Sequence, residues 1–103
     1  MVQKVNVGLR IPSIHPIDVA ALRRFVLKAE ALNFHSIWVG DHLFFKQDIL
    51  HPLSALSWIA SLTSNVRLGT AVMLTAYRDP VLLAKEAATL DYLSDGRVIL
   101  GIS

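Results

Sequence analysis

The chain has 103 residues, of which 53% are hydrophobic and 17% are charged, and it contains no cysteine. This composition excludes a disordered chain, which would be poorer in apolar residues and richer in charge, and it excludes disulfides, thiolate catalysis and zinc–cysteine sites. The net charge of +2 comes without a basic tract, so nucleic acid is not an expected partner.

The amino-terminal residues, MVQKVNVGLRIP, lack the apolar core of a signal peptide. No stretch approaches the roughly 20 apolar residues that are needed to span a bilayer. The length allows one domain at most. We therefore expect a cytoplasmic protein with one domain and no membrane partner.

The first part of the chain predicts a strand, a helix and a second strand. Residues 5–11 are aliphatic and β-branched, which is typical of a strand. Asp18 is a suitable N-cap for a helix, and Asn33 suits the left-handed position that ends one. Residues 36–40 form the second strand. The inner face of the helix is predicted from apolar residues at helical spacing: Val19, Leu22, Val26 and Ala29.

The second part continues the same alternation. A helix is predicted over residues 52–62, with proline in its first turn, and a strand over residues 66–73. Asp79 followed by Pro80 is a strong helix start, because an N-cap side chain precedes proline at the first helical position. Residues 94–96 end that helix, and a fourth strand covers residues 98–102.

The resulting order is β-α-β-α-β-α-β, which is typical of the α/β class. The inner strands RLGTAVM and RVILGI are almost continuously apolar, as in parallel strands that are buried on both faces. We expect parallel strands in sequential order, right-handed crossovers and helices on one face. Both a small open sheet and the first half of a TIM (β/α)8-type barrel fit this pattern, since a complete barrel needs about 250 residues.

Polar side chains follow the predicted strands, where parallel α/β folds bind ligands. His42 is a candidate acid or base, and Asp41 could hold a polar ligand group or orient a neighbour. The alternative is that Asp41 caps the following turn and His42 is a solvated loop residue. No histidine pair has a metal-site spacing, so no metal is predicted. The residues expected at this edge are Ser13, His15, Asp41, His42, residues 71–75 and Ser103.

Two glycines lie inside predicted strands. Gly69 and Gly101 each indicate either a bulge with a close backbone approach or room for packing, and the sequence favours neither. The chain has no GxGxxG turn and no P-loop, so the sequence predicts neither a dinucleotide turn nor a phosphate-binding P-loop.

Three segments together resemble the luciferase-like monooxygenase superfamily, which includes bacterial luciferase and oxidoreductases that use coenzyme F-420. These segments are ALNFHSIWVGDHL, RLGTAVM and DPVLLAKEAATLDYLSDGRVILGI. The resemblance covers the N-terminal part of a barrel about three times longer, and it implies a partial barrel domain over residues 1–103 that ends after the fourth strand. The family usually continues with glycine after LGI, where this chain has Ser103.

The resemblance also implies a site. His42 would be catalytic, whereas Asp41, Ala71 and Val72 would contact the cofactor. The cofactor would be a reduced flavin (FMN) or coenzyme F-420; VGDHL is more similar to the F-420 members, without settling the choice. The family often has a non-proline cis peptide that matches Ala71–Val72. We expect that bond to be cis in a complete barrel and trans in this chain alone.

The implied function is that of the N-terminal half of an oxidoreductase that acts on a small-molecule substrate by hydride transfer or oxygen activation. The alternative is a non-catalytic half-barrel that pairs with a second half as an assembly or binding module. Free edge strands and a bare inner face would recruit other chains, so we also expect a homo-oligomer.

Overall fold

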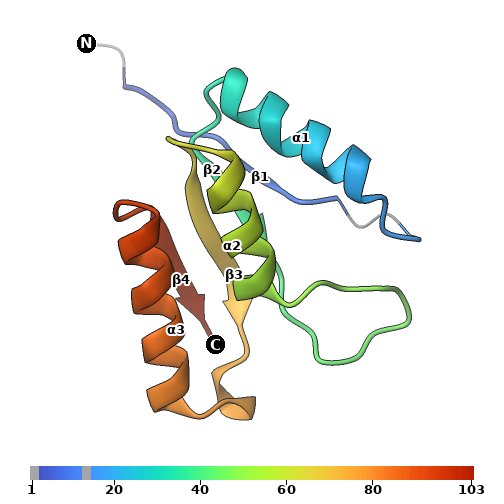
Figure 1. Ribbon diagram of the computed structural model, residues 1–103, viewed down its shortest axis with the longest axis vertical. Coiled ribbons are helices and arrows are strands. Elements are labelled where there is room, and N and C mark those ends of the chain that lie inside the picture. Colours follow the sequence, from blue (N-terminus) through green and yellow to red (C-terminus); the bar gives the residue numbers. More distant parts are fainter. Residues whose placement is uncertain (1–2, 13–14) are drawn as a thin grey trace.

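The computed structural model describes residues 3–12 and 15–103, which form one four-stranded sheet with three α-helices (Figure 1). All strands are parallel and lie in sequence order: β1 (Gly8–Arg10), β2 (Ser36–Val39), β3 (Arg67–Met73) and β4 (Val98–Ile102). The connecting elements are α1 (Val19–Ala31), α2 (Pro52–Leu62), a 3-10 turn η1 (Thr75–Tyr77) and α3 (Pro80–Leu93). The predicted α/β class and strand order are confirmed. None of the helices described here is both long and apolar enough to cross a bilayer.

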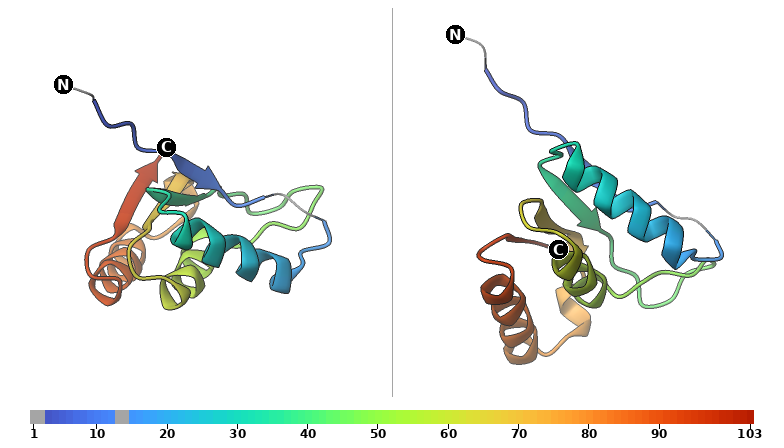
Figure 2. Two further views of the ribbon diagram at one scale, coloured as in Figure 1. Left: turned by 90° about the horizontal axis from the view of Figure 1, so that it is seen from above. Right: turned by 45° about the horizontal axis from the view of Figure 1, so that its top comes forward.

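All three helices lie on one side of the sheet, as the sequence predicts (Figure 2). The core fills the space between these helices and the sheet, and the opposite sheet face carries no helix. This arrangement matches one part of the wall of a TIM-type barrel, in which helices surround the strands. The largest fully buried side chains are Ile37, Leu56, Ile59, Leu68, Met73 and Val26.

The first strand is shorter than predicted. The sequence indicates residues 5–11, but the strand is limited to Gly8–Arg10, which pairs with Ser36–Trp38 of β2. Val7 still accepts a hydrogen bond from the His35 backbone N–H at 2.9 Å. Aliphatic composition alone therefore overestimates the length of an edge strand.

The helix boundaries follow the local signals in the sequence. Asp18 Oδ1 accepts a hydrogen bond from the Ala21 backbone N–H at 3.0 Å, and Asp79 caps α3 in the same way. Asn33 has a φ angle of 61°, the left-handed conformation expected after a helix. These caps satisfy backbone groups that a helix end leaves without partners.

Arg97 connects several segments at the amino-terminal ends of the strands by hydrogen bonds. Its side chain is buried, and it donates five hydrogen bonds, which hold the carboxyl end of α2 against the start of β4. Three of the five acceptors are carbonyl oxygens of Ala60, Thr63 and Val66, at 3.1–3.2 Å. The guanidinium therefore satisfies carbonyl groups at and just after the end of the helix.

Glu30 reinforces the same edge from α1. Its carboxylate accepts backbone N–H bonds from Ser64 and Asn65 at 2.8 Å and from Val66 at 3.0 Å. Burial by itself would raise the pKa of Glu30, but these bonds and the Arg97 charge outweigh it and lower the pKa. The carboxylate is thus more favourable in the folded chain than in the unfolded one.

Candidate functional site

The loops at the carboxyl ends of the strands are joined by hydrogen bonds. The Ser103 backbone N–H donates to the Met73 carbonyl at 3.2 Å, and the Thr75 hydroxyl donates to the Ser103 carbonyl at 2.8 Å. His15 is exposed, with its Nδ1 3.3 Å from Asp48 Oδ2. Ser13, the remaining residue that the sequence places at this edge, lies outside the described residues.

Asp41 is buried at the end of β2 and bonds to the loop that follows β3. Its side chain is 1% exposed. It accepts hydrogen bonds from two guanidinium nitrogens of Arg78, from Nη1 to Oδ2 at 2.5 Å and from Nη2 to Oδ1 at 3.0 Å. The Leu74 backbone N–H donates to Oδ2 at 2.8 Å, and Arg78 Nη1 also donates to the Leu74 carbonyl at 2.8 Å. Both carboxylate oxygens therefore have partners, and Asp41 fixes the β3–α3 connection.

The sequence patterns do not predict Arg78 as a partner of Asp41. It lies 37 positions after Asp41, so no local pattern links the two residues. The available signal was chemical: a carboxylate beside a buried strand needs a cation, and Arg78 stands directly before the helix start at Asp79–Pro80. Asp41 therefore does not cap the turn that follows it, as one alternative predicted, but bonds to the distant β3–α3 connection.

His42 has the opposite environment from its neighbour Asp41. Its side chain is exposed at the strand-end rim and stacks on Phe45, with ring centroids 4.9 Å apart and planes 24° apart. Asp41 thus faces the protein, whereas the imidazole of His42 remains accessible to a ligand. An exposed imidazole held on a fixed strand end can donate or accept a proton.

The end of β3 contains a bulge with a cis peptide bond between Ala71 and Val72. The prediction of a trans bond in this chain alone is wrong. Both neighbouring strands are present here: Thr70 pairs with Val39 of β2 and Leu100 of β4, so the segment is held from both sides without the rest of a barrel.

The two strand glycines have different roles. A Cβ atom on Gly101 would lie 2.3 Å from the Thr70 carbonyl oxygen, so Gly101 permits the close backbone approach at the bulge. A Cβ atom on Gly69 would lie 2.4 Å from the Trp38 ring, so Gly69 makes room for an aromatic side chain. The close-approach alternative therefore holds for Gly101, and the packing alternative holds for Gly69.

The strand ends carry mostly small side chains on the helix-free side of the sheet. Gly40 and Gly101 have no side chain, Ala71 is exposed, and Val72 is 42% exposed. The Arg10 guanidinium lies beside Gly40, and the remaining small residues leave room for a planar ring, with His42 at the adjacent rim. Among residues 3–12 and 15–103, no three His, Asp or Glu side chains are arranged to hold a metal ion.

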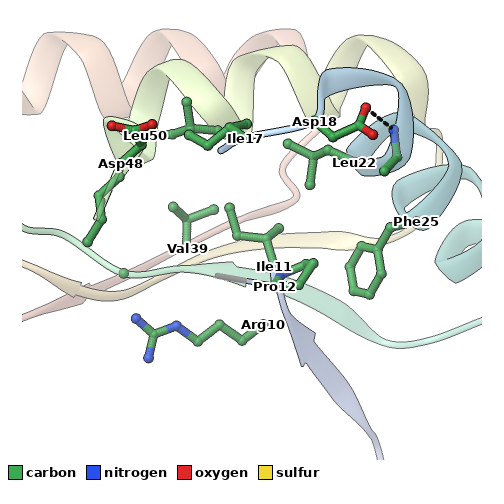
Figure 3. Close-up of a pocket in the computed structure, with 13 residues that line it drawn as sticks. Arg10, Ile11, Pro12, Ile17, Asp18, Leu22, Phe25, Val39, Asp48 and Leu50 are labelled. Atoms are coloured by element: carbon green, nitrogen blue, oxygen red, sulfur yellow. Dashed lines mark hydrogen bonds between the residues drawn. The ribbon is translucent and has the colours of Figure 1, made fainter. Parts of the chain in front are cut away.

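A cavity of about 230 Å³ lies elsewhere, between α1 and the loop that follows β2 (Figure 3). Its walls are mainly apolar and include Ile11, Leu22, Phe25 and Val39. It lies on the helix side of the sheet, and neither His42 nor the Ala71–Val72 bulge lines it. We therefore place the candidate site at the strand ends and not in this cavity.

Parallel strands in order, helices on one face and a polar rim at the carboxyl ends define part of a TIM-type barrel, a fold whose ligand sites generally lie at that rim. The sequence pattern of the luciferase-like monooxygenase family matches residues 5–103. The chain therefore belongs to the luciferase-like monooxygenase family.

The relatives include a coenzyme F-420-dependent enzyme and a monooxygenase chain. F-420-dependent glucose-6-phosphate dehydrogenase from Amycolatopsis mediterranei is 36% identical over 86 residues, covering 79% of this chain and 26% of that protein. The alkanal monooxygenase beta chain from Photobacterium leiognathi is 35% identical over 88 residues, covering 84% and 26%. The chain thus spans about a quarter of the length of these relatives.

A solved structure agrees in fold. The coenzyme F-420-dependent tetrahydromethanopterin reductase from Methanopyrus kandleri superimposes with a TM-score of 0.78 at 28% identity, covering 97% of this chain and 27% of that one. The described elements therefore match about a quarter of that enzyme's chain.

Proposed function

We propose that this chain contributes the strand-end half-site of an oxidoreductase that uses a reduced flavin or coenzyme F-420. One observation carries the proposal: the exposed His42 imidazole and the exposed Ala71 and Val72 lie at the carboxyl ends of the neighbouring strands β2 and β3. Family membership supports it, because relatives include enzymes named for coenzyme F-420 and for alkanal oxidation.

Each site residue has a defined task in this proposal. When bound, the cofactor supplies hydride transfer or the reaction of its reduced ring with oxygen. Ala71 and Val72 support the ring face and exclude water from it. His42 exchanges a proton with the reacting molecule at the rim, and Asp41 keeps that rim fixed through Arg78 and Leu74.

The cofactor itself is a separate proposal. The VGDHL segment, residues 39–43, favours coenzyme F-420, whereas the match to an alkanal monooxygenase chain is compatible with FMN. Parallel titrations with FMN and with coenzyme F-420, followed by fluorescence, distinguish the two. Tighter binding of FMN would reverse the preference, and binding of neither would contradict the proposed function.

Replacement of His42 by alanine tests the catalytic assignment. Positioned acid–base groups contribute about 10²–10⁴-fold in rate, and water replaces part of that effect. We therefore expect His42→Ala to lower turnover at least about tenfold in the enzyme that contains this chain, with a smaller change in cofactor affinity. His35→Ala is the control, because His35 lies at the opposite edge of the sheet. Wild-type turnover in His42→Ala at saturating substrate would contradict the assignment.

A further inference from the structure

Arg10 places a positive charge on the helix-free side of the sheet, beside the candidate site. It is the last residue of β1 and pairs in register with Trp38. Arg10 and Gly40 border the cavity, and Figure 3 shows the Arg10 side chain pointing away from the apolar residues Ile11, Leu22 and Val39. The guanidinium therefore belongs to the same surface as the strand-end rim.

The position of the Arg10 side chain depends on Gly40. A Cβ atom on Gly40 would lie 2.4 Å from Arg10 Nη2 and 3.2 Å from Cζ, so the guanidinium occupies the space that a side chain would fill. The same Cβ atom would lie 3.4 Å from the Ala71 carbonyl oxygen. Arg10 thus extends across the end of β2 toward the bulge that is proposed to support the ring.

The charge of Arg10 has no partner in the described part of the chain. The nearby carboxylate, Asp41, is already bonded to both nitrogens of Arg78 and to Leu74. The ion pairs within residues 3–12 and 15–103 join Arg78 to Asp41 and His15 to Asp48, and neither includes Arg10. Asp48 borders the same cavity as Arg10, but its ion-pair partner is His15. Arg10 is therefore an unpaired cation beside the candidate site, which favours a ligand with a negative charge.

We propose that Arg10, seated over Gly40, binds the negative charge of the reduced ring and so makes the bound cofactor easier to reduce. This inference rests on the proposed function, and it adds a residue that tunes the cofactor to those that support the ring. A reduced flavin-type ring loses a proton near neutral pH and spreads the charge over its pyrimidine end, where a protein cation stabilises it. The oxidised ring of FMN is neutral there and gains less from Arg10.

Two substitutions test this inference, with one control. Arg10→Met removes the guanidinium, whereas Gly40→Ala keeps the charge and displaces it by filling its space. Arg24→Met removes an exposed charge from α1 and serves as the control. The readouts are dissociation constants for oxidised and reduced FMN, the reduction potential of bound FMN, and urea midpoints that verify folding.

We expect Arg10→Met to weaken binding of the reduced form about tenfold while the oxidised form changes little, as expected for the loss of a charge-assisted hydrogen bond. A tenfold difference lowers the two-electron reduction potential of the bound ring by about 30 mV. Gly40→Ala should change both quantities in the same direction by a smaller amount, and Arg24→Met should match the wild type.

Three other outcomes would overturn the inference. Binding of the reduced ring by Arg10→Met as tightly as by the wild type would remove Arg10 from the site. In Arg10→Met, an equal loss of affinity for oxidised and reduced FMN, with inorganic phosphate competing against FMN only in the wild type, would show that Arg10 binds a phosphate group and not the ring. Failure of the wild type to bind FMN and also coenzyme F-420, in either redox form, would contradict the proposed function as well, which separates it from a failure of Arg10 alone.

Discussion

Substitution of Arg78 by methionine tests whether the buried ion pair holds the carboxyl edge together. The change keeps a long side chain but leaves the Asp41 carboxylate, which is 1% exposed, with the Leu74 backbone N–H as its remaining partner. Breaking a buried pair by removing one partner costs about 3–5 kcal/mol. Because Asp41 keeps one hydrogen bond and the Arg78 side chain is 12% exposed, we expect about 3 kcal/mol, the low end of that range.

The assay is urea denaturation of the variant, followed by circular dichroism. For a domain of this size each kcal/mol corresponds to about 4–8 °C, so the midpoint of thermal unfolding should also fall by about 12–24 °C. The matched control combines Arg78→Met with Asp41→Asn, which removes both charges and should recover a large part of the loss. A single variant within about 1 kcal/mol of the wild type would refute the argument, as would a double variant no more stable than the single one.

The remaining predictions concern acid sensitivity, the bulge and assembly. Because folding lowers the pKa of Glu30, the ionised Glu30 stabilises the folded chain fully above the ordinary carboxyl pKa range, and this stabilisation is lost as pH falls through the lowered pKa. In Glu30→Gln, the urea midpoint should therefore depend less on pH between about 3 and about 7 than in the wild type. Gly101→Ala should cost roughly 1–3 kcal/mol in urea denaturation, because its Cβ would overlap the Thr70 carbonyl, and a neutral result would contradict this contact. The edge strands and exposed Ile102 should make the chain self-associate, whereas a stable monomer in light scattering at micromolar concentration would exclude this.

The sequence predicts the elements of this fold well because their signals are local. Asp79 followed by Pro80 determines a helix start from two adjacent residues, and the structure begins α3 at Pro80. The end of the same helix is equally local, since Asp95 and Gly96 adopt the left-handed conformation with φ angles of 56° and 78°. The order of apolar strands and amphipathic helices then leaves few alternatives to a parallel sheet.

The candidate site is less predictable, because its geometry depends on residues that are distant in the sequence. Arg78 reaches Asp41 across 37 positions, and the Arg10 guanidinium lies over Gly40 on the neighbouring strand. Neither pair has a characteristic spacing. The shape of β3 at Ala71–Val72 is equally non-local, since β2 and β4 hold that strand on both sides.

The distribution of satisfied and unsatisfied charges separates the two edges of the sheet. At the amino-terminal edge, Arg97 donates five hydrogen bonds and Glu30 accepts three, so these groups are fully engaged in holding the fold. At the carboxyl edge, Asp41 and Arg78 are engaged in the same way, but the neighbouring His42 and Arg10 side chains remain exposed.

The two edges of the sheet differ in this way because an unpaired charge on a rigid surface contributes little to folding. A guanidinium that has no carboxylate partner gains more from a ligand than from the protein, and an exposed imidazole is available for proton exchange. The ion pair between Asp41 and Arg78 fixes the strand end that precedes His42, which limits the ordering cost of binding there. In the proposed site the ion pair would therefore act as a support, while Arg10 and His42 would contact the ligand.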